Sequence, residues 1–365
     1  MSELARSSRR LAQAAAPCQS WFTRCPVPTT FGIALQMGLL EREFGDDPLV
    51  SFRALQESTD PTVLQSHYTH TQPNSLRHGG NIPALYAQAS GADTKVIGLS
   101  FLRSSQAILV LPESGIRSVR DLRGRRLLVT RRKHEAIDHA YYSALRVYET
   151  ALATEGLTLA DVEIVEQTIL SRYIDDRPRQ KLRHGEPDSQ PERRSGRSWR
   201  NTLFPLVRGE VDAISSGGAA AALFVAQGGL DVVFDLRNLP LAQQANNNSP
   251  LLFAVKSRFL NERPDLVARV LGRVLEAELF ARDDPRGADG MLAKELSSGE
   301  APLRPTGAAC SFEELELDFA PWKISALKAQ ADFLWAKKAL PARVDVDSWL
   351  APEPLQRAHA GLLAA

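Results

Sequence analysis

The chain has 365 residues, which is more than one compact hydrophobic core usually holds and favours two lobes. Its 44 Lys and Arg against 43 Asp and Glu give a formal net charge of +1, so the overall charge does not indicate nucleic acid or a membrane as a partner. The three cysteines, Cys18, Cys25 and Cys310, have no metal-ligand spacing and leave an odd thiol. This usage predicts no metal site and a reducing compartment.

The N-terminal segment imitates an export signal without meeting its requirements. Ser8 and two arginines are followed by alanines, Pro17 and Cys18, but Gln13 and Pro17 interrupt the apolar core that a secretory signal needs. No window approaches the length of a membrane-spanning helix. We therefore interpret residues 1–18 as a loose or short helical arm on a cytoplasmic protein.

Cys25 is the first residue that indicates chemistry. It is followed by Pro-Val-Pro, which cannot lie inside a helix, so the thiol is expected on a loop at the mouth of a strand. A lone cysteine is more often a small buried apolar residue than a reactive group. Apolar spacing then predicts a helix over 30–40 that begins after Pro28 and Thr29 and points its N-terminus at the thiol, and alternation predicts a strand over 50–55.

A second stretch, residues 67–80, brings together three imidazoles, a guanidinium and a glycine pair. They are His67, His70, Arg77, His78 and Gly79-Gly80. Such groups can bind an anion beside a thiol. The glycine pair precedes an expected helix near Ile82, and its amides could face an oxyanion, although a plain turn is the more ordinary interpretation.

The remaining segments alternate between strand and helix patterns. Strands are expected at 95–100, 106–111, 125–129, 162–166, 211–214 and 251–255, and helices at 136–155, 203–208, 219–227, 264–281 and 326–338. Ser215 and Gly217 end one of these strands just before a helix, which is where open parallel sheets place ligands. The alternation gives an α/β fold with no internal repeat.

Two segments lack a clear pattern. Residues 175–200 are charged and nearly free of apolar side chains, which fits a solvated loop or a lid. The segment between the last two long helices appears irregular, and its aromatic residues Phe312, Phe319 and Trp322 are more typical of core than of a ligand platform.

The motifs at Cys25, His67 and Arg77, with Gln72-Pro73 between them and Gly79-Gly80 after them, resemble those of the 2'-hydroxybiphenyl-2-sulfinate desulfinase family. Further similarities include Leu203-Phe204-Pro205 and the segments 121–126, 209–213 and 349–353. The resemblance implies a two-lobed, type II periplasmic-binding-protein-like fold with a central cleft. Its expected lobes are 19–130 with 250–365, which carries the Cys, His and Arg set, and 131–249.

The resemblance also implies the reaction. It indicates a monomeric hydrolase that uses no cofactor or metal, cleaves the carbon–sulfur bond of an aromatic or related sulfinate, and releases sulfite. Arg77 would bind the sulfinate, Cys25 would attack sulfur or protonate the ring carbon, and His67 would support the thiol or the anion. Gly79, Gly80, His70, Ser215 and Gly217 are the expected substrate-binding residues. The alternative from another class is a non-catalytic anion-binding protein with the same fold.

Four residues depart from the family pattern. Thr23-Arg24 precede the cysteine, and an adjacent cation would lower the thiol pKa. His70 stands where an acidic residue is expected, and His78 stands where an aromatic one is expected. The two lobes, joined by crossings near Arg131 and Asn248, are expected to close over the ligand.

Overall fold

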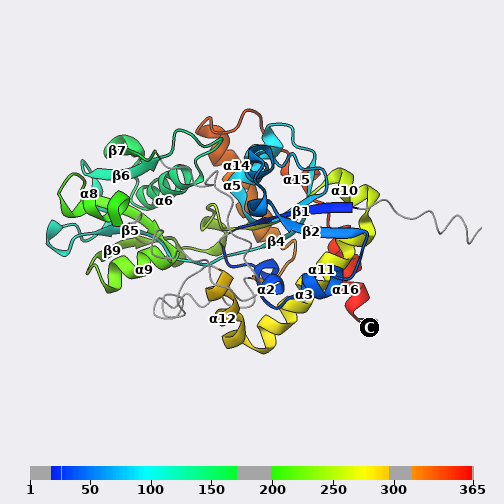
Figure 1. The fold of residues 1–365 in the computed structure, drawn as a ribbon. Coiled ribbons are helices and arrows are strands. Elements are labelled where there is room, and N and C mark those ends of the chain that lie inside the picture. Colours follow the sequence, from blue (N-terminus) through cyan, green and yellow to red (C-terminus); the bar gives the residue numbers. More distant parts are fainter. Residues whose placement is uncertain (1–17, 26, 171–198, 296–314, 364–365) are drawn as a thin grey trace, which may run out of the picture.

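The computed structural model describes residues 18–25, 27–170, 199–295 and 315–363, and these form two five-stranded mixed sheets. The first sheet has the order β2 (Val50–Ala54), β1 (Cys18–Arg24), β3 (Ser75–Gly80), β10 (Leu251–Lys256) and β4 (Thr94–Ser100). The second has the order β7 (Glu163–Thr168), β6 (Arg126–Arg131), β8 (Ala213–Gly217), β5 (Gln106–Val110) and β9 (Asp231–Asp235). Figure 1 shows the two sheets in separate halves of the molecule.

Both sheets follow one plan. β1 pairs in parallel with β2 and β3, and β6 pairs in parallel with β7 and β8. The strand that runs antiparallel to both of its neighbours is β10 in the first sheet and β5 in the second. Each of these strands is the first that the chain forms after it crosses over from the other sheet.

The first passage comes earlier than the sequence analysis placed it. β5 and β6 belong to the second sheet, so the chain changes sheet between Ser100 and Gln106 rather than near residue 130. The strand pattern at 106–111 was correct, but periodicity does not reveal which sheet a strand joins. The return passage lies between Asp235 and Leu251.

Helices cover the sheets (Figure 1). Those before the second sheet are α2 (Thr30–Gln36), α3 (Leu39–Phe44), α4 (Pro61–Thr69) and α5 (Asn81–Ala89). Those of the middle part are α6 (His139–Thr154), α8 (Phe204–Val207) and α9 (Gly218–Ala226). The last group is α10 (Ser257–Glu262), α11 (Pro264–Asp283), α12 (Pro285–Glu295), α14 (Pro321–Ala336), α15 (Val346–Trp349) and α16 (Glu353–Leu363).

The two faces of the first sheet bury different cores. On one face, Leu76 and Phe253 pack with residues of α2, α3, α11 and α16. On the other face, Leu99 and Leu252 pack with residues of α4, α5 and α14. Because side chains alternate along a strand, Arg77 lies on the opposite face from Leu76, beneath α4.

Most predicted elements are present, with two differences. The helix predicted over 30–40 begins at Thr30, with Thr29 accepting the Gly32 amide at 2.9 Å, but it ends at Gln36 because Gly38 takes a left-handed conformation with φ of 72°. The segment predicted to be irregular begins with the helix α12 and ends within α14, which contains Trp322. Trp322 packs edge to face on Phe101 at 4.8 Å, in agreement with the core interpretation.

Several sequence-based expectations fall outside the described residues. They are the arm over 1–17, the segment 175–198, Cys310 and Phe312. Within the described residues, no helix combines the length and apolar composition needed to cross a membrane.

Candidate active site

Cys25 directly follows β1, at the strand mouth where the prolines predicted it. The thiol belongs to a free cysteine whose exposed fraction is 7%. The Gln56 side chain secures the preceding residue: it donates to the Arg24 carbonyl at 2.7 Å and accepts the Arg24 amide at 3.2 Å. This pair of hydrogen bonds fixes the backbone at the point where the chain turns into the cysteine.

Arg24 points its guanidinium at a carboxylate rather than standing as an uncompensated cation. Its Nε and Nη2 donate to the two Glu295 oxygens at 2.7 and 2.5 Å, and Gln36 donates to Glu295 at 2.7 Å. The positive charge is therefore balanced by Glu295. The effect of Arg24 on the thiol stays a prediction, and Glu295 would weaken it.

Arg77 is a buried cation at the centre of the first sheet. Arg77 is 4% exposed, and on β3 it pairs with Thr23 of β1 on one side and with Ala254 of β10 on the other. Nη1 donates to the Gly80 carbonyl at 2.7 Å, whereas Nε has no hydrogen-bond partner among the described residues. No carboxylate of the described residues pairs with it. A buried charge without a counterion is costly, so the site favours an anion.

Gly79 is the point at which the thiol and the guanidinium meet. A Cβ atom placed on Gly79 would lie 2.3 Å from Cys25 Sγ and 3.4 Å from Arg77 Nη2. Cys25 Sγ and Arg77 Nη2 therefore both lie within 3.4 Å of the Cβ position of Gly79. Glycine is required because any side chain would displace the sulfur, and the structure brings Cys25 and Arg77 together as predicted.

Gly80 has a different reason to be glycine. A Cβ there would come within 2.6 Å of Asn247 Nδ2. Neither Gly79 nor Gly80 has a positive φ, and both continue β3 in register with Leu252 and Leu251 of β10. The expected glycine turn is therefore wrong: the pair ends a strand that runs directly into α5, and close approach explains its composition.

His67 and His70 come from α4, the helix that covers the Arg77 face of the sheet. His67 is 4% exposed and meets the Tyr68 ring edge to face at 4.8 Å. His70 caps the helix in a left-handed conformation with φ of 49°. It lines the same cavity as Arg77, and burial, followed by the charges of Arg77 and Lys256, lowers its pKa to about 3. His70 is thus neutral at physiological pH.

The His78 ring stacks on a neighbouring aromatic side chain, as a phenyl ring at this position would. It stacks on Phe253 at 5.1 Å, and its Nε2 lies 2.9 Å from the Ser100 hydroxyl. Burial and then the charge of Arg77 lower its pKa to about 3. A neutral, stacked imidazole satisfies the need for a flat apolar group, which explains the departure from the family pattern.

Ser215 and Gly217 lie in the second sheet, on β8 opposite Ile108 and Gln106 of β5. A Cβ on Gly217 would come within 2.6 Å of Gln106 Nε2, so close packing against β5 accounts for this glycine. Among the described residues, no hydrogen bond joins Ser215 or Gly217 to Cys25 or Arg77. Their place in substrate binding stays a prediction.

No local pattern in the sequence marks His139, which begins α6 in the other half of the molecule. Desolvation at this half-buried position lowers its pKa, and the positive charges of Arg132 and Arg77 lower it further. His139 is therefore close enough to feel the Arg77 charge although it lies 62 positions later in the chain. Gln56 and Glu295 were missed as well, because no local pattern marks a partner at such separation.

Comparisons with known proteins show which proteins the chain resembles. The chain is 25% identical over 355 residues to the 2'-hydroxybiphenyl-2-sulfinate desulfinase of Rhodococcus erythropolis, and the match covers 91% of each chain. A desulfinase of Rhodococcus qingshengii matches at the same identity and coverage. A family model described as NMT1/THI5 like matches residues 80–175. These matches confirm the resemblance inferred from the motifs.

Solved structures confirm the fold. The desulfurization enzyme DSZB aligns with a TM-score of 0.71 and 24% identity over 94% of this chain and 99% of its own. A mutant of that enzyme in complex with biphenyl-2-sulfinic acid aligns with a TM-score of 0.70 and 23% identity, at the same coverage. The periplasmic aliphatic sulphonate-binding protein SsuA of Escherichia coli aligns at 0.64 and 17% identity over 93% of this chain and 92% of its own. The two mixed sheets are thus of the periplasmic-binding-protein-like kind.

Proposed function

We propose that this protein is a desulfinase that cleaves the carbon–sulfur bond of an aromatic or related sulfinate and releases sulfite without a cofactor. The observation that carries the proposal is the meeting of Cys25 Sγ and Arg77 Nη2 above the backbone of Gly79. The desulfinase of Rhodococcus, similar over 91% of the chain, supplies the class of substrate.

Arg77 binds the sulfinate in this proposal. Its guanidinium is permanently charged, and its planar fork donates parallel hydrogen bonds to two oxygens of one anion. Burial raises the strength of this interaction, because little water remains to screen it. The Gly80 amide, His67 and His70 are proposed to complete the substrate site, together with Ser215 and Gly217 from the second sheet.

Cys25 is the proposed reacting group, and two routes give the same balance: sulfinate and water become the desulfinated product and bisulfite. In the first, the thiolate attacks sulfur, the bond from carbon to sulfur breaks, the carbon takes a proton, and water then releases bisulfite from the cysteine. In the second, the thiol gives its proton to the ring carbon, sulfur dioxide leaves, and water hydrates it while the thiol regains a proton.

Sulfite release tests the proposal. Purified protein incubated with 2'-hydroxybiphenyl-2-sulfinate and a panel of aryl and alkyl sulfinates should liberate sulfite, and Cys25→Ser should abolish the release. A thiol that carries an added SO₂ unit, seen by mass spectrometry of the trapped Cys25 peptide, would select the first route. Absence of sulfite with every sulfinate would contradict the proposal.

The alternative is a non-catalytic binding protein for a sulfinate or sulfonate, since SsuA shares the fold. It requires the anion contact of Arg77 but no thiol chemistry. Tight binding of a sulfinate with no turnover, unchanged in Cys25→Ser, would favour it.

We further propose that the protein is a cytoplasmic monomer and acts as a hydrolase. The odd number of cysteines in the sequence supports a reducing compartment. Light scattering of the purified chain and detection of the product formed from labelled water would test the oligomeric state and the reaction class.

A further inference from the structure

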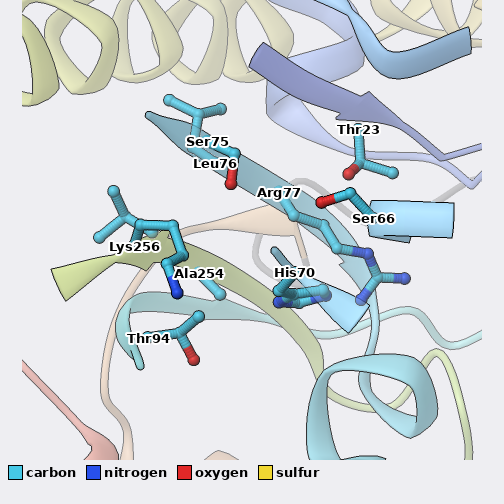
Figure 2. A pocket seen from close by; sticks show the side chains of 10 residues that line it. Thr23, Ser66, His70, Ser75, Leu76, Arg77, Thr94, Ala254 and Lys256 are labelled. Carbon is cyan, nitrogen blue, oxygen red and sulfur yellow. The ribbon is translucent and has the colours of Figure 1, made fainter. Parts of the chain in front are cut away.

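A small polar cavity lies beneath Arg77, between the first sheet and α4. The polar side chains around it are His70, Arg77, Lys256 and the hydroxyls of Thr23, Ser66, Ser75 and Thr94. Figure 2 shows Arg77 and Lys256 on opposite sides of the His70 ring. The space inside accommodates about one particle of the size of a water molecule. It is therefore too small for an aryl group.

The charges around this cavity are of one sign. Two cations line it, and none of the described residues that line it is a carboxylate. Neither Arg77 nor Lys256 forms an ion pair with the described residues. Two like charges at a largely buried site repel and are poorly solvated, unless a counterion lies between them.

His70 adds no charge to the cavity at physiological pH, because burial and the nearby cations keep its ring neutral. Its ring is nearly buried, at 6% exposed, and Nε2 has no hydrogen-bond partner among the described residues. The Arg77 Nε atom is also buried and has no hydrogen-bond partner among the described residues. Two buried polar nitrogens thus lack partners at one cavity, which indicates a ligand that accepts hydrogen bonds.

We propose that this cavity binds a small monovalent inorganic anion of the size of chloride, attracted by the Arg77 guanidinium and the Lys256 ammonium that line it. Thr23 and Ser66 also line the cavity, and their hydroxyls are proposed to donate to the anion. The inference does not depend on the desulfinase activity, since it rests on the cavity and its charges alone.

The cavity is distinct from the point where the thiol meets Arg77. It lies toward the start of β3, where Ser75 lines it, and toward the end of β10, where Lys256 pairs with Thr94. Cys25 lies at the other end of β3, against Gly79. Arg77, with His70 beside it, therefore borders both sites, and an anion in the cavity balances the Arg77 charge from the side away from the thiol.

Thermal denaturation and chloride NMR test the proposal. Chloride and bromide should raise the melting temperature by a few degrees more than gluconate at equal ionic strength, because an anion that binds the folded state stabilises it. The ³⁵Cl resonance should broaden in the presence of the protein. Lys256→Met should weaken chloride binding by about tenfold, as expected for loss of one half-buried charge partner.

Lys95→Met is the matched control. Lys95 lies on the neighbouring strand β4, but its Nζ donates to the Ser348 carbonyl at 2.8 Å, and it does not line the cavity. This variant should keep the halide effect. Crystals soaked in bromide should show anomalous density inside the cavity that Arg77 and Lys256 line, which provides a measurement that needs no variant.

Two results would overturn the proposal. Equal melting temperatures in chloride and gluconate would show that water alone fills the cavity. A halide effect that persists in Lys256→Met would place the anion on the thiol side of Arg77 or on the surface, which would leave the proposed function intact and remove this second site.

Discussion

Arg24 and Glu295, which are 271 positions apart in the chain, form an ion pair with two hydrogen bonds. Arg24 Nε donates to Glu295 Oε1 at 2.7 Å, and Arg24 Nη2 donates to Oε2 at 2.5 Å. The Glu295 side chain is 2% exposed and that of Arg24 22%. The pair ties the residue before the thiol to the end of α12. Its position suggests that Glu295 acts on the thiol through Arg24 without touching the substrate.

Glu295→Gln should lower the rate of sulfite release about tenfold. The variant leaves Arg24 without its counter-charge and loosens the backbone that carries Cys25, and small displacements at a reacting group have large effects on rate. The free energy of unfolding should fall by about 1–3 kcal/mol, below the value for a fully buried pair because Arg24 is partly solvated. Sulfite assays and urea denaturation measure both effects.

The control for Glu295→Gln is Glu210→Gln. Glu210 pairs with Arg208 at 2.7 Å, but both side chains are more than half exposed. This pair should contribute little, so rate and stability should stay unchanged. Equal effects in the two variants would show that Glu295 has no special role at the thiol.

Gly79→Ala should reduce sulfite release about a hundredfold. The new methyl group would stand 2.3 Å from Cys25 Sγ, so the sulfur must move away from Arg77. Gly272→Ala, in α11 with no atom near the new methyl group, should keep full activity and gain up to about 1 kcal/mol of stability. Wild-type turnover in Gly79→Ala would show that the thiol and Arg77 need not meet there.

Glu278→Gln should change the pH dependence of stability. Burial raises the pKa of Glu278 to about 7, and its carboxyl accepts the Leu317 amide at 3.0 Å. The folded state holds a proton that the unfolded state releases above its own pKa of 4.5, so wild-type stability falls as pH rises from about 4.5 to about 7. The fall is about 3 kcal/mol and should be absent in the variant.

Urea denaturation at pH 5 and pH 8 measures this difference. Glu276→Gln serves as the control, because Glu276 lies on the same helix with its side chain 39% exposed and paired with Arg273. If Glu278→Gln retained the wild-type loss of stability between the two pH values, the carboxyl would not be held protonated by burial.

His78→Phe should reduce acid sensitivity. The histidine is neutral in the fold with a pKa of about 3, whereas in the unfolded chain it takes up a proton below about 6.5. Stability is therefore lost as pH falls from about 6.5 to about 3, at about 1.4 kcal/mol per pH unit for this one group. The phenyl ring keeps the stacking on Phe253, and the exposed His359→Gln should leave the acid limb unchanged. An unaltered slope in His78→Phe would contradict the assignment.

The sequence alone predicted the strands, most helices and the position of Cys25, because these depend on local patterns: alternation, apolar spacing, and prolines that exclude a helix. The same local logic predicted the helix start at Thr30, where Thr29 caps the first turn. The identity of the motif around Cys25, His67 and Arg77 further indicated the reaction, and the comparisons agree with that resemblance.

Only the tertiary structure decided which groups meet. Periodicity could not assign β5 to the second sheet, because strand pairing depends on contacts between distant segments. Gly79 was interpreted as a turn residue, yet it is glycine because Cys25 comes within 2.3 Å of where its Cβ would be. Arg24 was expected to act on the thiol as an adjacent cation, and its pairing with Glu295 could not be seen from the sequence. Each of these outcomes is set by packing in three dimensions, to which the residues adjacent in the chain give no local signal.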